Sequence, residues 1–364
     1  MRIGKLIAAT ALAILLVTQV QARPEMPNCP GLDKDGHRLP LTPAAVPGVT
    51  TAEEDRQPVP DDLANAARKA IGHFESGGGD AYSNISRLDT ISIGYLQWNW
   101  GTGSLIHHFV GALMDADIAL APSPLRGDLE TLKRYQRQGD RRRLSAEAII
   151  RRWTTAAAGD DLVRGVRKSV RNQLAAWLSR PEIKSVQDGL IDPKLRLSYS
   201  YARKWMTDSA DIGSLSGNLK ETTTSFFDLL TYNDGRQGLW VPHVREYRKL
   251  FASNKEIVDF IADWTISCES VVKPGPTDTK LYNTDEASAN ARRWKQKVAA
   301  DPNAFSDNQT NLLIFGFLRA LSSVGANPPR GFHGIFQADV MLRRGAVALR
   351  IGTIRGIPVE TVLN

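Results

Sequence analysis

The stretch that decides the fold is residues 67–105, with the sequence ARKAIGHFESGGGDAYSNISRLDTISIGYLQWNWGTGSL. Its first part continues a run of apolar residues at helical spacing, which begins after two acidic residues at 61–62. Acidic residues suit the start of a helix, and consecutive glycines end one. We therefore predict a helix that stops at the glycines of residues 77–79, with Glu75 in its last turn.

The second part of this stretch consists of a polar segment followed by an apolar and aromatic one. Residues 80–90 are polar and suit a hairpin or an irregular loop. Residues 91–98 are apolar and aromatic with Gly94 inside them, a pattern that fits either a strand or the start of a buried helix. Two glycines then allow a tight turn before Ser104, whose side chain is suited to capping a helix over 105–113.

The rest of the chain is mostly helical in pattern, with apolar residues at i, i+3 and i+4. The further predicted helices are 129–135, 145–157, 161–178, 193–206, 222–232, 244–264 (as one helix or two), 287–300, 311–322 and 337–344. For residues 346–357 the pattern leaves a helix and a strand open. We expect an α+β fold that is predominantly helical, with a small β element near Glu75.

The N-terminal residues have the features of a secretory signal. Arg2 and Lys5 precede an apolar run at 6–17 that is too short to span a bilayer, and small residues follow at 20–22. We predict a signal peptide at 1–22, a Pro-rich irregular arm at 23–60 and a helical domain at 61–364. The protein is then expected in the periplasm or outside the cell, without stable membrane insertion after cleavage; an uncleaved N-terminal anchor is the alternative.

The charge balance is basic, with 46 Lys and Arg against 39 Asp and Glu and a net charge of +7. A basic surface favours acidic partners such as nucleic acid, anionic lipid or a carboxylate-bearing cell wall. A merely soluble basic protein is the alternative, and charge alone does not exclude it. The arginine clusters at 141–143 and 151–152 are interpreted as solvated helix faces or loops rather than as a dedicated binding site.

The two cysteines, Cys29 and Cys268, can pair in an oxidising compartment and would then tie the Pro-rich arm to the body of the protein. Two free thiols are the alternative. The six histidines show no His-Glu-x-x-His pattern, and the cysteines lack zinc-site spacing. We expect no metal and no cofactor.

Glu75 has the position that glycosidic cleavage requires of a general acid. A carboxyl at the C-terminal end of a helix, beside apolar side chains, stays protonated to higher pH. An ordinary exposed Glu at a helix end is the alternative. Asp89 is the first candidate for a second carboxylate, with Asp80 behind it, although a turn residue explains Asp89 nearly as well. A single Glu suffices if a hydroxyl of the sugar itself attacks.

Candidate glycan contacts follow about twenty residues after Glu75. Sugars are held by flat aromatic faces and by amide or hydroxyl hydrogen bonds, and four residues here supply both: Tyr95, Gln97, Trp98 and Asn99. The alternative for the tryptophans at 98 and 100 is that they fill the core; we expect one of them to do so while Gln97 faces the cleft.

These motifs resemble a known superfamily. Glu75-Ser76 followed by Gly-Tyr-Leu-Gln at 94–97 resembles the Glu-Ser…Gly-Leu-Met-Gln signature of lytic transglycosylases and goose-type lysozymes. Residues 92–105 (SIGYLQWNWGTGSL) are more closely similar to the S-x-G-x-L-Q-W-N-x-G-x-G-S-L run of bacterial exported proteins with a lysozyme-like domain, often described as peptidoglycan-binding. Chitosanases of the same superfamily carry a comparable Gly-Thr-Gly run. Weaker similarities lie at 226–233 and 338–344.

The resemblance implies a lysozyme-like domain in which Glu75 matches the catalytic Glu beside the cleft. The segment before residue 92 is shorter than the Asp-Gly-x-Gly loop of that group and lacks its glycines, so Asp89 has no strict counterpart there. We expect an exported monomeric enzyme that cleaves peptidoglycan or a related polysaccharide, of lysozyme or lytic transglycosylase type, and that binds no nucleic acid. The alternatives are a non-catalytic peptidoglycan-binding protein on the same fold and a chitosanase-like hydrolase, whose cationic substrate would favour an acidic cleft.

Overall fold

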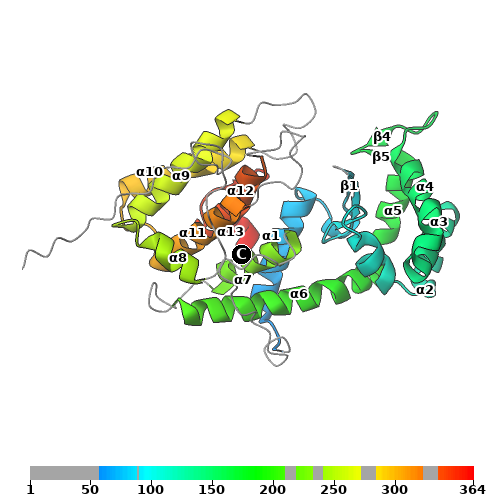
Figure 1. The fold of residues 1–364 in the computed structure, drawn as a ribbon, viewed down its shortest axis with the longest axis horizontal. Coiled ribbons are helices and arrows are strands. Elements are labelled where there is room, and N and C mark those ends of the chain that lie inside the picture. Colours follow the sequence, from blue (N-terminus) through cyan, green and yellow to red (C-terminus); the bar gives the residue numbers. More distant parts are fainter. Residues whose placement is uncertain (1–56, 88–89, 210–218, 233–240, 272–283, 323–334) are drawn as a thin grey trace, which may run out of the picture.

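The computed structural model describes residues 57–87, 90–209, 219–232, 241–271, 284–322 and 335–364, which form a predominantly helical protein with small antiparallel sheets (Figure 1). The helices are α1 (Asp61–Ser76), α2 (Asp115–Ala119), α3 (Ser123–Gln138), α4 (Arg143–Thr154), α5 (Lys168–Leu178), α6 (Pro181–Asp208), α7 (Leu219–Tyr232), α8 (Val241–Arg248), α9 (Asn254–Val271), α10 (Thr284–Ala300), α11 (Asp307–Ser322), α12 (Ile335–Leu349) and α13 (Val359–Leu363). Short helical turns are η2 (Ala81–Ser83), the π-helix η3 (Leu105–Val110) and η4 (Gly139–Arg142). The predicted helical α+β class is confirmed.

The sheet nearest Glu75 has three antiparallel strands in the order β1 (Ile85–Arg87), β2 (Ile91–Ile93) and β3 (Trp98–Asn99). Ser92 lies opposite Asn99 in its register. The chain turns between β2 and β3 at Gly94, whose φ of 75° is available to glycine at low cost. The predicted β element beside Glu75 is therefore present, and residues 91–98 contribute strands rather than a helix.

Two further hairpins correct the helical predictions. The segment 161–178 begins with β4 (Leu162–Val163) and β5 (Val166–Arg167), and only from Lys168 does it become helix α5. Its apolar spacing fits a helix, but Arg164 and Gly165 adopt positive φ and close a two-residue turn. Residues 346–357 contain both alternatives, the end of α12 and the hairpin of β6 (Thr353–Ile354) and β7 (Ile357–Pro358).

Two other boundary predictions were wrong. The helix expected over 193–206 begins earlier, at Pro181, and continues through Pro193, because residues on both sides of that proline pack into apolar clusters. Ser104 does not cap the helical segment after it. Its Oγ instead accepts a hydrogen bond from the backbone N of Asn99 at 2.8 Å, which ties the turn to β3.

The described residues bury two apolar clusters that share helix α6. One contains α1, the β1–β3 sheet, α2–α5 and the first half of α6, and the other contains the end of α6 with α8–α11. Helices α7 and α12 contribute residues to both clusters. Ile191 belongs to the first cluster and Trp205 to the second. In Figure 1, α6 accordingly runs beneath both halves of the molecule, with α1 between them.

Several predictions fall on other parts of the chain. The signal peptide at 1–22, nearly all of the arm at 23–60, Cys29 and Asp89 lie outside the described residues. Cys268 is buried in α9 and is not a free thiol. Because Cys29 lies outside the described residues, its pairing with Cys268 stays a prediction. Among the described helices, none combines the length and the apolar character needed to cross a membrane.

Candidate active site

Glu75 is positioned by the way α1 ends. Gly77 adopts φ 69°, and its backbone N donates to the carbonyl of His73 at 2.9 Å, which closes the last turn. The side chain of Asn84 then donates from Nδ2 to the backbone oxygen of Glu75 at 2.7 Å. The end of the helix and the start of the sheet therefore hold the backbone of Glu75 from both sides.

The Glu75 side chain enters a cluster of charged residues from three helices, the Glu75 cluster: Glu75 (α1), Asp228 (α7), Asp339, Arg343 and Arg344 (α12). Nη1 of Arg343 lies 2.9 Å from Oε1 of Glu75 and 3.6 Å from Asp228. Nη2 of the same guanidinium lies 3.1 Å from Asp339. Arg344 donates from Nε to the other oxygen of Asp228 at 2.7 Å. One guanidinium thus joins three carboxyl groups.

The environment raises the pKa of the Glu75 carboxyl above its ordinary value. Burial is the largest cause, and the carboxylates of Asp228 and Asp339 add to it, while Arg343 opposes both. The side chain of Glu75 retains 14% exposure, and no described residue donates a hydrogen bond to Oε2. Glu75 can therefore hold a proton above the pH at which an exposed Glu loses it, with one oxygen not occupied by the protein.

The partners of Glu75 were not identified as site residues from the sequence. They lie in segments whose motifs gave only weak similarities, 226–233 and 338–344. A stronger signal was present, since Asp228, Asp339 and the arginines at 343–344 interrupt otherwise apolar helices. Charged side chains inside such helices are rarely buried unless they are paired.

Two of the predicted glycan contacts lie in the core. Tyr95 and Trp98 are each 4% exposed. The Tyr95 hydroxyl donates to the backbone oxygen of Arg68, and the Trp98 ring stacks on Phe109 with centroids 4.9 Å apart. This placement does not support a glycan contact by Tyr95 or Trp98; both side chains fix the sheet against the helices.

The two predicted amide contacts are partly exposed but hydrogen-bonded within the sheet. Gln97 donates from Nε2 to the carbonyl of Gly94 at 2.8 Å and accepts from Ser86 Oγ at 2.8 Å. Asn99 donates from Nδ2 to Ser92 Oγ at 2.9 Å, and its Oδ1 accepts from Thr102 N at 3.0 Å. Both amides shape the strands next to Glu75.

No free second carboxylate lies beside Glu75 among the described residues. Asp80 accepts a hydrogen bond from the backbone N of Tyr82 and pairs with Lys184 at 3.2 Å, so it caps η2. Asp228 and Asp339 are nearer to Glu75, but arginines bind both of them. Asp89 lies outside the described residues, and its role as a base stays a prediction.

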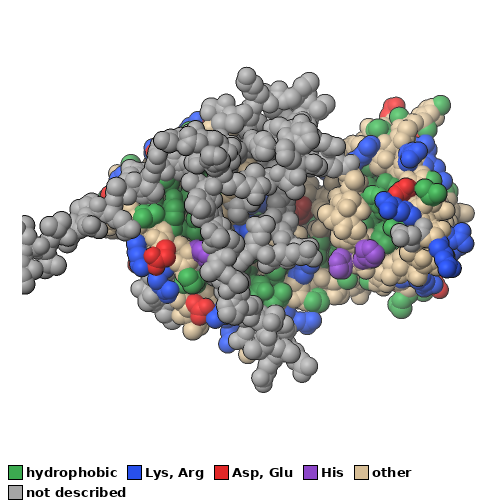
Figure 2. Space-filling view, viewed as in Figure 1, with side chains coloured by type: hydrophobic (Ala, Val, Ile, Leu, Met, Phe, Trp, Pro, Cys, Tyr) green, Lys and Arg blue, Asp and Glu red, His purple; other side chains and the backbone are tan. Residues whose placement is uncertain are grey.

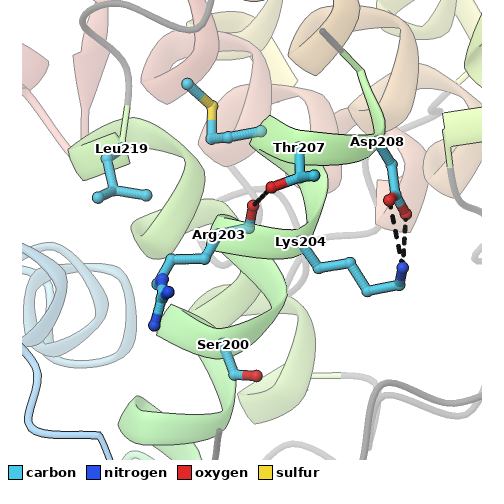
Figure 3. Close-up of a pocket in the computed structure, with 7 residues that line it drawn as sticks. Ser200, Arg203, Lys204, Thr207, Asp208 and Leu219 are labelled. Atoms are coloured by element: carbon cyan, nitrogen blue, oxygen red, sulfur yellow. Dashed lines mark hydrogen bonds and ion pairs between the residues drawn. The ribbon is translucent and has the colours of Figure 1, made fainter.

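A separate hollow lies at the C-terminal end of α6 (Figure 3). It is lined by Ser200, Arg203, Lys204, Met206, Thr207, Asp208 and Leu219. Lys204 pairs with Asp208 at 2.9 Å beside this hollow. It shares no residue with the Glu75 cluster.

Neither a metal-binding group among the described residues nor a match to a known protein indicates a function for this site. The described part of the chain holds no group of three or more His, Cys, Asp or Glu arranged to bind a metal ion. The chain matches no protein-family model, no curated protein and no solved structure. Any function must therefore be argued from the residues around Glu75 and from the sequence motifs.

Proposed function

We propose that this protein is an exported enzyme that cleaves the glycan strands of peptidoglycan, with Glu75 as the general acid on a lysozyme-like fold. The observation that carries the proposal is the buried Glu75 carboxyl, whose pKa is raised and whose Oε2 accepts no hydrogen bond from a described residue. Its place at the end of a helix, directly before a small antiparallel sheet, agrees with the motif similarity of residues 75–105.

The reaction begins when Glu75 donates its proton to the glycosidic oxygen, while the bond from that oxygen to the anomeric carbon breaks. The leaving sugar departs with a hydroxyl, and positive charge develops on the sugar that remains. Arg343 then faces an ionised Glu75 and stabilises it through the 2.9 Å contact. Burial thus favours the acid before proton transfer, and Arg343 favours the carboxylate after it.

The second half of the reaction has two forms. In hydrolysis, water attacks the anomeric carbon and a carboxylate, for which Asp89 remains the candidate, accepts its proton. In transglycosylation, a hydroxyl of the same sugar attacks, and the ionised Glu75 takes the proton back. The second form needs only the carboxyl described here. A free reducing end in the product indicates hydrolysis, and an anhydro end indicates transglycosylation.

Clearing of purified peptidoglycan by the chain without residues 1–22 tests the proposal. Glu75→Gln should abolish the decrease in turbidity, because the amide cannot donate the proton. Glu130→Gln is the matched control, since Glu130 is an exposed carboxyl on α3. Clearing by Glu75→Gln at the wild-type rate would disprove the role of Glu75.

The main alternative is a peptidoglycan-binding protein without catalysis. The observation that favours it is the ion pair itself, since Arg343 holds Oε1 of Glu75. Such a protein would sediment with the wall and leave its turbidity unchanged.

A further inference from the structure

Two apolar side chains at one end of α3 are highly exposed. Leu144 at the start of α4 is 81% exposed, and Met114 before α2 is 65% exposed. The other large apolar side chains that are exposed in the described part of the chain, Leu162 and Val163 of β4, reach only 40% and 38%. A single exposed apolar residue needs no explanation, whereas two in one place indicate a contact surface.

Contacts with the last turn of α3 place both residues at this end of the helix. Asp115, which follows Met114, pairs with Arg137 at 3.2 Å. Arg142, two residues before Leu144, donates from Nε to the side chain of the last residue of α3 at 3.1 Å. The two apolar side chains therefore belong to the same end of the α3–α4 pair.

The same end of the helix pair is rich in arginine. We call residues 114–115 and 134–144 the α3–α4 tip, and it contains five exposed arginines: Arg134, Arg137, Arg141, Arg142 and Arg143. Asp115 and Glu147 each pair with one of them. The other three, Arg134, Arg141 and Arg142, have no carboxylate partner among the described residues. The tip therefore keeps positive charge that an anionic partner can neutralise.

The backbone that carries the two apolar side chains is fixed. The backbone N of Met114 donates to the carboxylate of Asp117 at 2.7 Å. Lys133 donates from Nζ to two backbone carbonyls where η3 ends, at 3.0 and 2.9 Å, which attaches the segment before Met114 to α3. Leu144 lies within α4 itself. Both side chains are therefore held outward by ordered structure.

The combination of apolar and cationic groups distinguishes among anionic partners. A hydrated polymer, such as nucleic acid or a glycan strand, can pair with guanidinium groups but offers no apolar layer for Leu144 and Met114. The interface of a phospholipid bilayer offers both, since the phosphates lie directly above the acyl chains. Arginine side chains reach the phosphates while their apolar neighbours enter the layer beneath. A bilayer with anionic lipid therefore fits the tip best.

We propose that the α3–α4 tip docks on a bilayer that contains anionic phospholipid, with Leu144 and Met114 inserted and the arginines bound to lipid phosphates. This gives a role to the arginine cluster at 141–143, which the sequence alone assigns to a solvated face. The α2–α5 region forms one end of the molecule, and α1, which carries Glu75, lies nearer its middle (Figure 1). The docking surface is separate from the proposed general acid and does not rest on its activity.

Co-sedimentation with vesicles tests the proposal, using the chain without residues 1–22 because the apolar run at 6–17 would itself bind lipid. This chain should bind vesicles of phosphatidylcholine with phosphatidylglycerol, and phosphatidylcholine alone far more weakly. Leu144→Ser and Met114→Ser remove the inserted groups without changing the charge, and each should weaken binding roughly tenfold. Leu162→Ser on β4, which follows the opposite end of α4, is the matched control and should change nothing.

The contribution of charge is measured with the same vesicles. Arg141→Gln and Arg142→Gln should each weaken binding roughly fivefold, because each removes one cation that faces the lipid phosphates. Lys297→Gln on α10 is the control, since Lys297 is exposed and lies outside the α3–α4 tip. It should bind the anionic vesicles like the unsubstituted chain.

Sedimentation with purified peptidoglycan distinguishes a bilayer surface from a wall surface, with Glu75→Gln added so that the wall is not consumed. Leu144→Ser and Met114→Ser should leave sedimentation with the wall unchanged, because a hydrated polymer does not bury these side chains. Equal losses on the wall and on the vesicles would overturn the bilayer as the partner. So would an absence of binding to the anionic vesicles, unchanged vesicle binding by both apolar variants, or an equal loss in Leu162→Ser.

These outcomes separate the docking surface from the proposed function. Clearing of the wall without any binding to anionic vesicles would overturn the docking surface and leave the enzyme. Vesicle binding that depends on Leu144 and Met114, without any clearing, would overturn the enzyme and leave the docking surface. Neither vesicle binding nor clearing would overturn both.

Discussion

At the scale of single residues, the surroundings of Glu75 determine its proton affinity. Three carboxyl groups share Arg343, and burial raises the pKa of two of them, Glu75 and Asp339. The sequence indicates the position of Glu75 at the end of a helix but not the residues that surround its side chain. The glycines at 77–79 predict where α1 ends, but the ion pair joins residues 268 positions apart, and no local pattern encodes it.

Asp339→Asn should lower the pKa of Glu75. The substitution removes a nearby negative charge, and it leaves Arg343 with one carboxylate fewer to share. Because the proposed mechanism requires the acid form of Glu75, activity should be lost at a lower pH than in the wild type. The pH dependence of wall clearing measures the shift; an alkaline limb that stays in place or moves upward would contradict the electrostatic argument.

Glu221 on α7 provides a test of buried charge away from the site. It is 1% exposed, and burial raises the pKa of its carboxyl. Because the pKa of Glu221 is higher in the folded state than in the unfolded state, its protonation favours the folded state at acidic pH. This contribution to the free energy of unfolding is lost as the pH rises from about 4 through the folded-state pKa. Glu221→Gln should therefore gain stability relative to the wild type between pH 4 and pH 8. Thermal unfolding across that range measures it, and a difference independent of pH would refute the prediction.

At the scale of elements, a few hydrogen bonds and an ion pair connect the β1–β3 region and α1 to α6. Gln187 on α6 accepts a hydrogen bond from the backbone N of Tyr95 at 2.9 Å. Arg68 on α1 pairs with Asp188 at 2.6 Å on the same helix, and the Tyr82 hydroxyl donates to that carboxylate at 2.7 Å. These contacts hold α1, the sheet and α6 together around Glu75.

Gly94→Ala should break this contact. Its Cβ would lie 2.7 Å from both Gln187 Oε1 and the Trp98 ring, at a φ of 75°. A steric clash and backbone strain together should cost about 3 kcal/mol of unfolding free energy. Gly127→Ala is the control, since nothing lies within 4 Å of its Cβ on α3 and the change should stabilise the helix by about 0.5–1 kcal/mol. Denaturant unfolding compares them, and equal stabilities would show that the contact is not tight.

Element predictions succeeded where local signals were strong and failed where they were not. Helical spacing identified α1, α7, α10 and α11, because each has a continuous apolar face. The β4–β5 hairpin was missed because Arg164-Gly165 is a weaker turn signal than Asn-Gly. Tyr95 and Trp98 were assigned to the cleft because composition alone does not show which way an aromatic side chain faces.

At the scale of the whole molecule, the positive charge is unevenly distributed. Residues 115–180 contain 14 Lys and Arg against eight Asp and Glu, which accounts for most of the net charge of +7. Figure 2 shows Lys and Arg side chains on the half of the molecule that contains α2–α5. The arginine runs at 141–143 and 151–152 belong to it and are exposed, as expected for solvated faces.

Binding to peptidoglycan should consequently weaken with salt. Exposed charges are screened over about 8 Å at 0.15 M ionic strength and over about 3 Å at 1 M. Sedimentation of the Glu75→Gln protein with the wall at 0.05, 0.15 and 0.5 M NaCl should show a progressive loss of binding. Binding that is independent of salt would exclude electrostatic attraction as a source of affinity.

The central claim is that Glu75 is the acid that cleaves a glycan strand, and the most direct measurement is the mass of the soluble fragments released from purified peptidoglycan. The chain without residues 1–22 should release disaccharide-containing fragments, either with reducing ends or lighter by one water as anhydro sugars. Glu75→Gln should release none, while Glu130→Gln releases the wild-type set. Fragments from Glu75→Gln, or none from the wild-type protein while it still sediments with the wall, would contradict the claim.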